Sequence, residues 1–336
     1  MADKYNCVLV DFDYKKENSD FIKILEDTTS CKWIINQKIT NHLHGGLLKN
    51  IIRFIIYFIY PLTILKHRNR IDKIIGWQQF YGLNYAFWCR IFHLKKVNDL
   101  TVMTFIYKKK SGAIGMLYHT YMKYIVTSKY IDRFICFAKE ECTYYSDLFG
   151  IAKDKFIYIQ LGEGEIRTKD LNICDNGYLF ATGRSNRNYD FIVDLLADTQ
   201  YHLIIACDTY KRKDLPQNIT LLQNCYENDM LKIMAKCHCV LVPLKNLNMS
   251  SGQLVVLQAM ALGKPVICTK TDGICDYVVN HNTGYLVDNN SHDWINALND
   301  LNDKNVWSLI SNNSLLAYQQ QFTKKAMYKR IANLFC

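Results

Sequence analysis

The sequence predicts an α/β protein with two parallel sheets, each covered by helices on both faces. Short apolar runs rich in β-branched residues alternate with helix-length segments, a pattern typical of βαβ units. The chain has 336 residues, about twice the usual domain size. The alternation also restarts after residues 161–176. These observations indicate two Rossmann-like domains that face each other across a cleft, where ligands bind at the carboxyl ends of the strands.

In the first half of the chain, six segments have the length and composition of buried strands. They are residues 5–11, 32–36, 73–77, 100–107, 133–137 and 155–160. Residues 112–128 and 139–149 have the length and spacing of helices between them. Together these segments predict an N-terminal domain over residues 1–172.

The second half repeats the pattern. Strands are predicted at residues 177–182, 202–207, 219–222, 239–242, 265–269 and 285–287. Helices are predicted at residues 189–198, 227–236 and 252–262. After residue 291 only helices are expected, and the last covers residues 324–334. Glycines in the boundary segment suit a hinge. We expect a C-terminal domain over residues 173–322, with residues 323–336 packing back on the first.

Composition places the chain among globular proteins. Apolar residues make up 49% and charged residues 21% of the sequence, which excludes the disordered, collagen-like and coiled-coil classes. Several of the 13 cysteines lie inside apolar runs, namely Cys7, Cys136, Cys207, Cys239 and Cys268. Because no signal peptide begins the chain, we expect buried free thiols in a reducing cytosol. No ligand spacing indicates a metal site.

The basic residues are concentrated in one part of the chain. The formal net charge is +10. Residues 51–150 hold 15 Lys and Arg against 6 Asp and Glu, whereas residues 175–336 hold 15 against 14. A local basic face favours an anionic membrane surface or a phosphorylated partner. No nucleic-acid-binding motif is present, so we expect no nucleic-acid partner.

The most apolar stretch is residues 54–65, which contain Pro61 and precede a basic cluster at residues 66–70. A helix of this length rises about 18 Å, too little for a hydrocarbon core of about 30 Å. Two interpretations stay open. Residues 51–70 form an interfacial helix on anionic lipid, or the helix packs on a sheet with cations at its carboxyl end.

A candidate phosphate site follows the predicted strand at residues 177–182. Gly183 lets a ligand approach the backbone. Arg184 and Arg187 lie in a short polar loop before a helix, whose amino end carries partial positive charge. Planar guanidinium groups suit phosphate oxygens. The alternative is a solvated loop in which both arginines pair with nearby aspartates.

A second candidate site surrounds the start of a later apolar helix. Ser250 or Ser251 can cap this helix, and Gly252 exposes backbone N–H groups to an anion. Gln253 opens the helix, and Gln258 is the large polar side chain within it. A buried glutamine needs hydrogen-bond partners. If Gln258 has a binding role, these partners are sugar hydroxyls. If its role is structural, they belong to a neighbouring loop.

Three segments resemble glycosyltransferase family 4. They are GRSNRNYDFIVDLL at residues 183–196, SSGQLVVLQAMALGKPVICTKTDGICDYVVNHNTGYLV at residues 250–287, and YIDRFICFAKEE at residues 130–141. The similarity is strongest over residues 130–325. It implies the GT-B fold, transfer with retention of configuration, and no obligatory metal or other cofactor. It also implies a nucleotide-diphosphate sugar as the donor substrate, with a UDP sugar favoured.

The resemblance also implies roles for single residues. Arg184 matches the family's phosphate-binding arginine, and Arg187 stands where the family usually has lysine. Ser250 and Gln258 stand at the first and second acids of the family's E-x7-E motif. Both acids are therefore replaced by neutral side chains that can still form hydrogen bonds. Backbone amides at Ser251–Gln253 would cradle the diphosphate, with Gly183 beside them.

Acceptor contacts are expected in the first half of the chain. Trp77, Gln78 and Gln79 follow a predicted strand, and an aromatic face with two amides suits sugar stacking and hydroxyl contacts. A domain interface would use the same side chains. Tyr107 and Lys108 lie in the region where the family often carries a histidine, which this sequence lacks.

The expected activity is transfer of a hexosyl unit to an acceptor hydroxyl, on a lipid-linked or cell-surface polysaccharide precursor. The protein is expected in the cytoplasm, peripheral on the inner face of the plasma membrane. A non-catalytic protein of the same fold that binds a sugar nucleotide or phosphosaccharide is the main alternative, because both motif acids are missing. A nucleotide-sugar epimerase would need an acid/base pair that these loops do not show.

Overall fold

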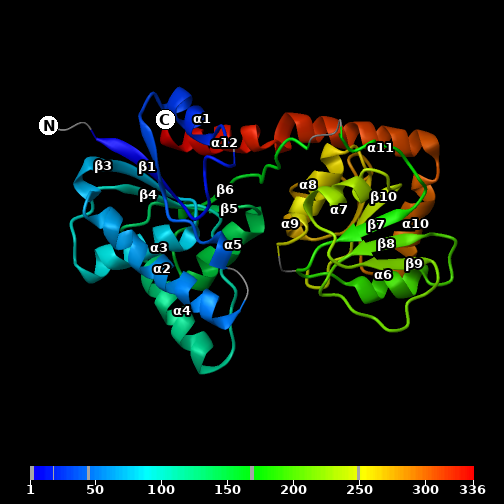
Figure 1. The fold of residues 1–336 in the computed structure, drawn as a ribbon, viewed down its shortest axis with the longest axis horizontal. Coiled ribbons are helices and arrows are strands. Elements are labelled where there is room, and N and C mark those ends of the chain that lie inside the picture. Colours follow the sequence, from blue (N-terminus) through cyan, green and yellow to red (C-terminus); the bar gives the residue numbers. More distant parts are fainter. Residues whose placement is uncertain (1–3, 18, 44–45, 167–169, 248–249) are drawn as a thin grey trace. The chain divides into compact units, whose positions relative to one another are not determined.

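The computed structural model describes residues 4–17, 19–43, 46–166, 170–247 and 250–336. The chain divides into two compact units (Figure 1). Unit 1 comprises Met1–Ile159 with Tyr328–Cys336, and unit 2 comprises Gln160–Met327. The boundary expected at residue 172 thus falls inside unit 2. The chain passes from one unit to the other twice.

Unit 1 is built on a six-stranded parallel sheet with the strand order β2-β1-β3-β4-β5-β6. The strands are β1 (Tyr5–Val10), β2 (Trp33–Gln37), β3 (Ile71–Gly76), β4 (Asp99–Val102), β5 (Arg133–Cys136) and β6 (Phe156–Tyr158). Cys7 of the central β1 is paired with Ile34 on one side and Ile74 on the other. Strands buried on both faces explain the nearly continuous apolar runs in the sequence.

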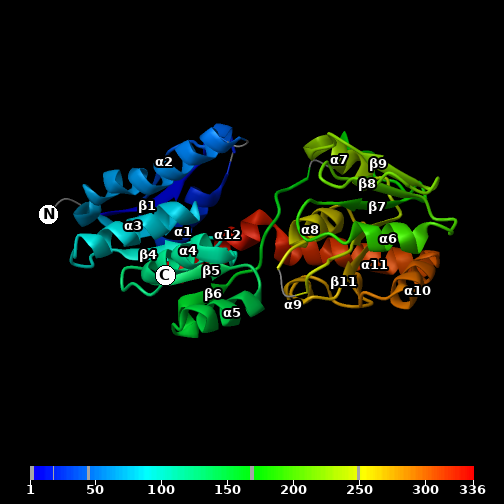
Figure 2. The same ribbon diagram turned by 90° about the horizontal axis from the view of Figure 1, so that it is seen from below.

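Helices cover both faces of this sheet. They are α1 (Phe21–Thr29), α2 (Leu47–Leu65), α3 (Gln79–Ile91), α4 (Gly112–Val126), α5 (Lys139–Phe149) and the end of α12 (Lys324–Ala332). The step from β1 to β2 runs opposite to all later steps, so right-handed crossovers place α1 opposite the other helices. Accordingly α1 and α12 cover one face (Figure 1), and Figure 2 shows α2, α3, α4 and α5 side by side on the other.

Two elements of unit 1 differ from expectation. Helix α2 begins seven residues before the predicted apolar run at residues 54–65, since Lys49, Asn50 and Arg53 interrupt its hydropathy without disfavouring a helix. Strand β4 ends at Val102, five residues earlier than predicted. Thr104 has φ 51°, and this left-handed conformation turns the chain out of the strand.

Unit 2 has a second six-stranded parallel sheet, ordered β12-β11-β10-β7-β8-β9. Its strands are β7 (Leu179–Thr182), β8 (Leu203–Ala206), β9 (Ile219–Leu222), β10 (Cys239–Val242), β11 (Val266–Thr269) and β12 (Tyr285–Val287). The predicted strands of this half are confirmed within one or two residues. The chain order reverses at β7, which is where open α/β sheets bind ligands.

Helices also cover both faces of the second sheet. They are α6 (Tyr189–Leu196), α7 (Glu227–Met234), α8 (Gln253–Ala261), α9 (Asp272–Cys275), α10 (Ser291–Leu301) and α11 (Lys304–Ala317). One apolar cluster joins α7 and α8 to the sheet, and a second joins α6 and α10 to the opposite face. A π-helical turn, Tyr318–Phe322, then leads into α12.

The C-terminal residues belong to unit 1, where their side chains are part of the core. The Tyr328 ring lies 4.9 Å from the ring of Phe21, and the Phe335 ring lies 5.3 Å from that of Trp33. Lys73 Nζ donates to the Phe335 carbonyl at 3.0 Å. All 13 cysteines are free, and the five expected in the core are buried. Burial raises the pKa of Cys7 to about 12, so this thiol stays neutral.

Candidate functional site

Three loops meet at the carboxyl edge of neighbouring strands of unit 2. They follow β7, β10 and β11, which lie side by side in the sheet. Among the described residues these loops cover 183–188, 243–247 with 250–252, and 270–271, the last of which leads into α9. Because the strands are parallel, all three loops emerge on the same edge, next to the start of α8.

Asn186 links the first two loops. Its Nδ2 donates to the Asn246 carbonyl at 2.9 Å and to Ser251 Oγ at 2.9 Å. Its Oδ1 accepts the Asn246 N–H at 2.7 Å. Asn186 has φ 56°, a left-handed conformation in which asparagine is several-fold enriched. This residue was not predicted from the sequence, although an asparagine inside a short turn-like loop is a signal for such a role.

The amino end of α8 points its first N–H groups at the meeting point of the loops. The N-cap residue is Gly252, and among the described residues no side chain forms a capping hydrogen bond there, so these groups are available to an anion. Gly252 has φ 93°, and a Cβ there would lie 2.9 Å from Val242 Cγ1. Only glycine therefore fits this position without strain.

The two serines before α8 have separate partners. Ser250 Oγ accepts from Gln253 Nε2, and Ser251 Oγ accepts from Asn186. Gly273, in the first turn of α9, brings its backbone so close that a Cβ would lie 2.9 Å from Ser250 Oγ. The structure thus brings Ser250, Ser251 and Gln253 together. The hydroxyls fix the loops to one another and leave the helix end uncapped.

Arg187 folds back over the end of β7. Its guanidinium group lies against Gly183, where a Cβ would approach Nη2 to 2.4 Å, so the glycine makes room for it. Nε donates to the Thr182 carbonyl at 3.0 Å and Nη1 to the Ser185 carbonyl at 2.7 Å. Burial lowers the pKa of Arg187 from its ordinary value. Within the described part of the chain no carboxylate pairs with this half-buried cation.

Arg184 takes a different direction from Arg187. Its Nη2 donates to Asp208 Oδ2 at 3.1 Å, and its guanidinium carbon lies 5.3 Å from the centre of the Tyr226 ring. The Tyr226 hydroxyl also donates to Asp208. Hydrogen bonds from Tyr226 and from the Asn224 N–H, with Arg184 nearby, hold the pKa of Asp208 below its usual range. One of the two predicted arginines is thus already paired.

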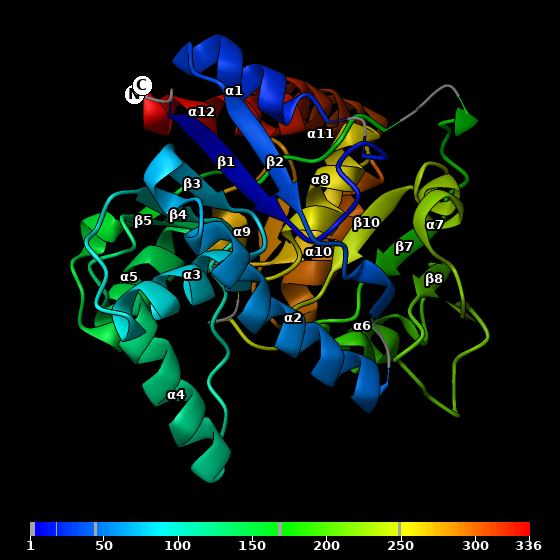
Figure 3. The ribbon, with the colours of Figure 1, turned by 60° about the vertical axis from the view of Figure 1, so that its left-hand side comes forward.

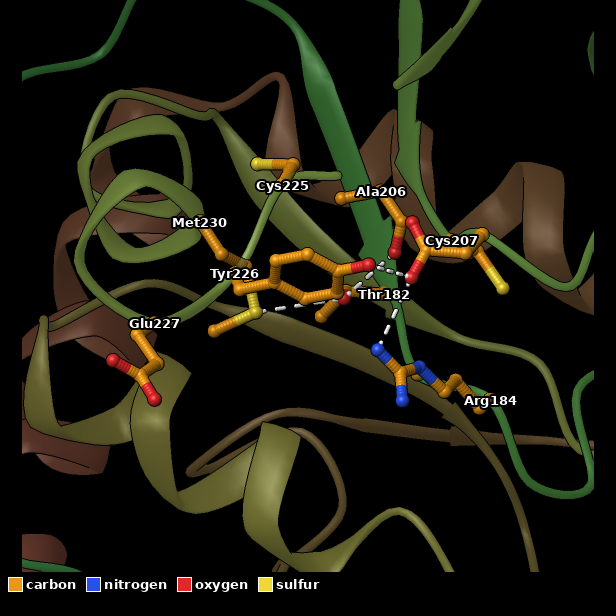
Figure 4. Close-up of a pocket in the computed structure, with 10 residues that line it drawn as sticks. Thr182, Arg184, Ala206, Cys207, Cys225, Tyr226, Glu227 and Met230 are labelled. Carbon is orange, nitrogen blue, oxygen red and sulfur yellow. Dashed lines mark hydrogen bonds and ion pairs between the residues drawn. The ribbon is translucent and has the colours of Figure 1, made fainter. Parts of the chain in front are cut away.

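A pocket of about 540 Å³ opens beside Arg184 (Figure 4). It lies where β7 and β8 end and α7 begins. Its walls are formed by Thr182, Gly183, Arg184, Ala206, Cys207, Asp208, Cys225, Tyr226, Glu227 and Met230. Figure 4 shows the Tyr226 ring, the Met230 thioether and the Arg184 guanidinium group around this space. Its walls therefore combine an aromatic ring, a cation and a carboxylate.

Gln258 lies further along α8. Its Nε2 donates to Glu163 Oε2 at 3.3 Å. Glu163 is fixed by its backbone, because its N–H donates to the Phe322 carbonyl at 2.9 Å and its carbonyl accepts from the Lys324 N–H at 2.8 Å. Position 258 has no carboxylate of its own, but the carboxylate of Glu163, from another part of unit 2, lies beside it.

Most of the acceptor candidates of unit 1 already have partners within that unit. The Trp77 ring lies 4.9 Å from that of Phe21. Gln78 Nε2 donates to Asp11 Oδ2 at 2.8 Å, and Gln79 Oε1 accepts the Ile106 N–H at 3.0 Å. The hydroxyl of the buried Tyr107 lies 3.1 Å from His119 Nδ1. Lys108 alone among the five has an exposed side chain.

Part of unit 2 is similar to a known protein family. Residues 177–304 match the family Glycosyl transferases group 1. The matched region contains all three loops, the start of α8 and the pocket beside Arg184. No curated protein sequence matches the chain significantly.

Several solved structures share the fold over nearly the whole chain. Anabaena HepE in complex with UDP has 14% sequence identity and a TM-score of 0.68, over 98% of this chain and 99% of that chain. Sucrose-phosphate synthase from Thermosynechococcus elongatus has 13% identity and a TM-score of 0.64, over 99% and 98%. WaaG, a glycosyltransferase involved in lipopolysaccharide biosynthesis, has 14% identity and a TM-score of 0.62, over 98% and 99%. The predicted GT-B fold is confirmed.

Proposed function

We propose that this protein transfers a hexosyl unit from a nucleotide-diphosphate sugar to an acceptor hydroxyl. The observation that carries the proposal is the meeting of three loops around the uncapped start of α8, inside the region that matches group 1 glycosyl transferases. In glycosyl transfer from such a donor, negative charge develops on the departing diphosphate. A preorganised set of N–H donors in this place stabilises that charge.

Arg187 is the first residue assigned to the diphosphate. It is half-buried and its hydrogen bonds go to neutral carbonyl groups, so its positive charge is not compensated by a carboxylate among the described residues. A bound diphosphate would supply the missing anion. Arg184 is assigned to the same group, and binding requires it to exchange Asp208 for phosphate oxygens.

A UDP sugar is the favoured donor. The pocket beside Arg184 is large enough for a nucleoside and contains an aromatic ring for stacking. The structural neighbour HepE has been crystallised with UDP. Ser250, Ser251, Gly252 and Gln253 would hold the phosphates, and Gln258 with Glu163 would contact donor hydroxyls. We assign retention of configuration, with the leaving oxygen taking the acceptor proton on the same face of the sugar.

The acceptor is assigned to unit 1. We propose a lipid-linked saccharide precursor, which requires the protein to work at the cytoplasmic face of a membrane. Support comes from the basic excess and exposed apolar side chains of unit 1. Lys108, exposed at the carboxyl edge of the first sheet, is the residue of the predicted acceptor set that can meet an anionic acceptor.

Nucleotide release from UDP-sugars tests the proposal. Arg187→Ala and Arg184→Ala are each expected to reduce turnover by about 10²–10³-fold, the effect of removing one charge-stabilising donor. Arg212→Ala is the matched control, because Arg212 lies in the same unit but pairs with Asp194 and Asp214 at the surface. Near-normal turnover in both active-site variants would overturn the diphosphate assignment.

A second candidate function is donor binding without transfer. It is favoured by one observation, namely that neutral Ser250 and Gln258 replace both motif acids. The same assay separates the two functions. A binder is stabilised thermally by a UDP-sugar but releases no UDP, whereas the transferase releases UDP in proportion to the acceptor supplied.

A further inference from the structure

The exposed apolar side chains of unit 1 gather at the beginnings of two helices. At the start of α2, Leu47 is 79% exposed and Leu48 is 70% exposed. At the start of α4, Ile114 is 75% and Leu117 is 71% exposed. Further exposed members of the two groups are Ile51, Ile52, Phe54, Ile55 and Ile59 on α2 and Met116 on α4. Such groupings on a monomer mark an interaction surface.

Helix α2 belongs to the fold of unit 1, although by length and composition alone it could cross a membrane. Pro61 has no N–H, so the Tyr57 carbonyl loses its helical donor. Asn84 Nδ2 donates to that carbonyl at 2.9 Å, and Trp88 Nε1 donates to the Phe58 carbonyl at 2.7 Å. Both donors come from α3. The second half of α2 is therefore fixed to the unit, while its first half presents apolar side chains to solvent.

The two exposed helix starts lie on the same edge of the sheet. Helix α2 connects β2 to β3 and α4 connects β4 to β5. In a parallel sheet each such helix begins at the carboxyl edge and returns to the amino edge. Both helices contact α3, which lies between them in Figure 2, and Figure 3 shows α4 projecting from the body of the unit. Their first turns thus form two separate apolar points on one side of unit 1.

Basic side chains accompany both points. Residues 28–131 contain sixteen Lys and Arg but only two acids, Asp72 and Asp99. Lys49 lies in the first turn of α2, and the exposed residues 108–110, all lysine, lead into α4. Lysine is depleted in the cores of protein–protein interfaces, but lysine beside leucine and isoleucine suits lipid phosphates above acyl chains. The combination favours an anionic bilayer as the partner.

The basic cluster at residues 66–70 cannot be the main contact. It follows the last turn of α2, so the helix separates it from Leu47 by about 28 Å. It also leads directly into β3 and therefore lies at the amino edge of the sheet. The apolar side chains that would enter lipid are at the other end.

We propose that the first turns of α2 and α4 together form a two-point docking face for an anionic bilayer. Leu47, Leu48, Ile114 and Leu117 enter the headgroup–acyl boundary, and Lys49 with Lys108 contacts lipid phosphates. Two points fix the orientation of unit 1 relative to the bilayer, with the first turns of both helices toward it. This proposal rests on the membrane assignment made for the acceptor under the proposed function and names the surface that makes the contact. The binding itself does not depend on sugar transfer, so failure of vesicle binding and failure of UDP release are separate results.

Vesicle co-sedimentation tests it, with the full chain and without donor. The probes are vesicles of phosphatidylcholine alone and of phosphatidylcholine with phosphatidylglycerol. Wild-type protein is expected to bind the anionic vesicles and to be released by salt. The variant Leu48→Asn/Ile114→Asn/Leu117→Asn is expected to lose binding by about tenfold or more, with an unchanged thermal transition, since exposed substitutions rarely affect stability.

The matched control carries the same kind of change on unit 2. Leu309 and Leu316 of α11 are 58% and 52% exposed, and Leu309→Asn/Leu316→Asn is expected to bind vesicles like wild type. A second control, Lys66→Ala/Arg70→Ala, is expected to lose less binding than the triple variant. Failure of wild type to bind anionic vesicles at low salt would overturn the proposal. So would self-association of wild type that the triple variant abolishes without any effect on vesicle binding.

Discussion

At the scale of single residues, the loop after β7 shows how neighbouring arginines acquire different properties. Arg184 and Arg187 looked equivalent in the sequence, as two cations before a helix. In the structure Arg184 is paired with Asp208 at the surface, whereas Arg187 is half-buried and bonded to carbonyl groups. The difference arises because Gly183 leaves space that Arg187 fills. Sequence spacing could not reveal which arginine turns inward.

Glu141 provides a test of electrostatics inside unit 1. It lies in the first turn of α5, and burial raises its pKa from 4.5 to about 7, although N–H groups of Phe137 and Ala138 oppose this shift. Between these pH values the folded state binds more protons than the unfolded state. The free energy of unfolding therefore falls as pH rises from 4.5 to about 7. This carboxyl destabilises the protein once it is ionised.

Glu141→Gln is accordingly expected to stabilise the protein above pH 7 by about 1–3 kcal/mol and to flatten this part of the pH profile. Urea unfolding at several pH values measures both effects. Glu140→Gln, at the exposed neighbouring position, is the matched control and is expected to leave the slope unchanged. A Glu141→Gln profile parallel to that of wild type would contradict the assignment.

At the scale of elements, a side chain of α3 replaces the backbone hydrogen-bond donor that α2 lacks at Pro61. Asn84 satisfies the Tyr57 carbonyl that lost its donor, and it also accepts the Tyr121 hydroxyl from α4. One buried amide thus connects three helices. The contacts of Asn84 with Tyr57 and Tyr121 could not be predicted from the sequence. A proline in an apolar run indicates which backbone carbonyl lacks a donor, but not which side chain donates to it instead.

A double-mutant cycle tests whether Asn84 compensates for the N–H that Pro61 lacks. Asn84→Ala is expected to lower the free energy of unfolding by about 1–3 kcal/mol, because it leaves a buried carbonyl unpaired. In a Pro61→Ala background the restored N–H pairs with the Tyr57 carbonyl, and the same substitution is expected to cost about 1 kcal/mol less. The lost Tyr121 contact is common to both backgrounds and cancels. If Asn84→Ala lowers the free energy of unfolding equally in both backgrounds, Asn84 does not compensate for the missing N–H.

Element boundaries were predicted well where local signals dominate. Helix α5 was predicted at residues 139–149, as observed, because Gly150 ends it in a left-handed conformation. Strand β4 and helix α2 were predicted less well. The left-handed turn at Thr104 ends β4, and the first half of α2 is exposed, so its polar residues interrupted the apolar pattern on which the prediction relied.

At the scale of the whole molecule, the alternation of strands and helices was enough to predict two parallel α/β sheets, and comparison confirms the GT-B fold. The candidate loops of unit 2 were predicted for the same reason, since they follow parallel strands. The linking role of Asn186 and the contact of Gln258 with Glu163 were not predicted. Both depend on residues distant in sequence whose meeting only the folded chain determines.

Calorimetric titration with UDP and with uridine tests the central claim most directly, that the edge of the second sheet holds a diphosphate. Wild type is expected to bind UDP on the order of a hundredfold more tightly than uridine, since charge-assisted hydrogen bonds contribute about 1.5–3 kcal/mol each. Arg187→Ala is expected to reduce this ratio about tenfold while leaving uridine binding unchanged. Equal affinities for UDP and uridine in wild type, or a ratio untouched by Arg187→Ala, would contradict the account.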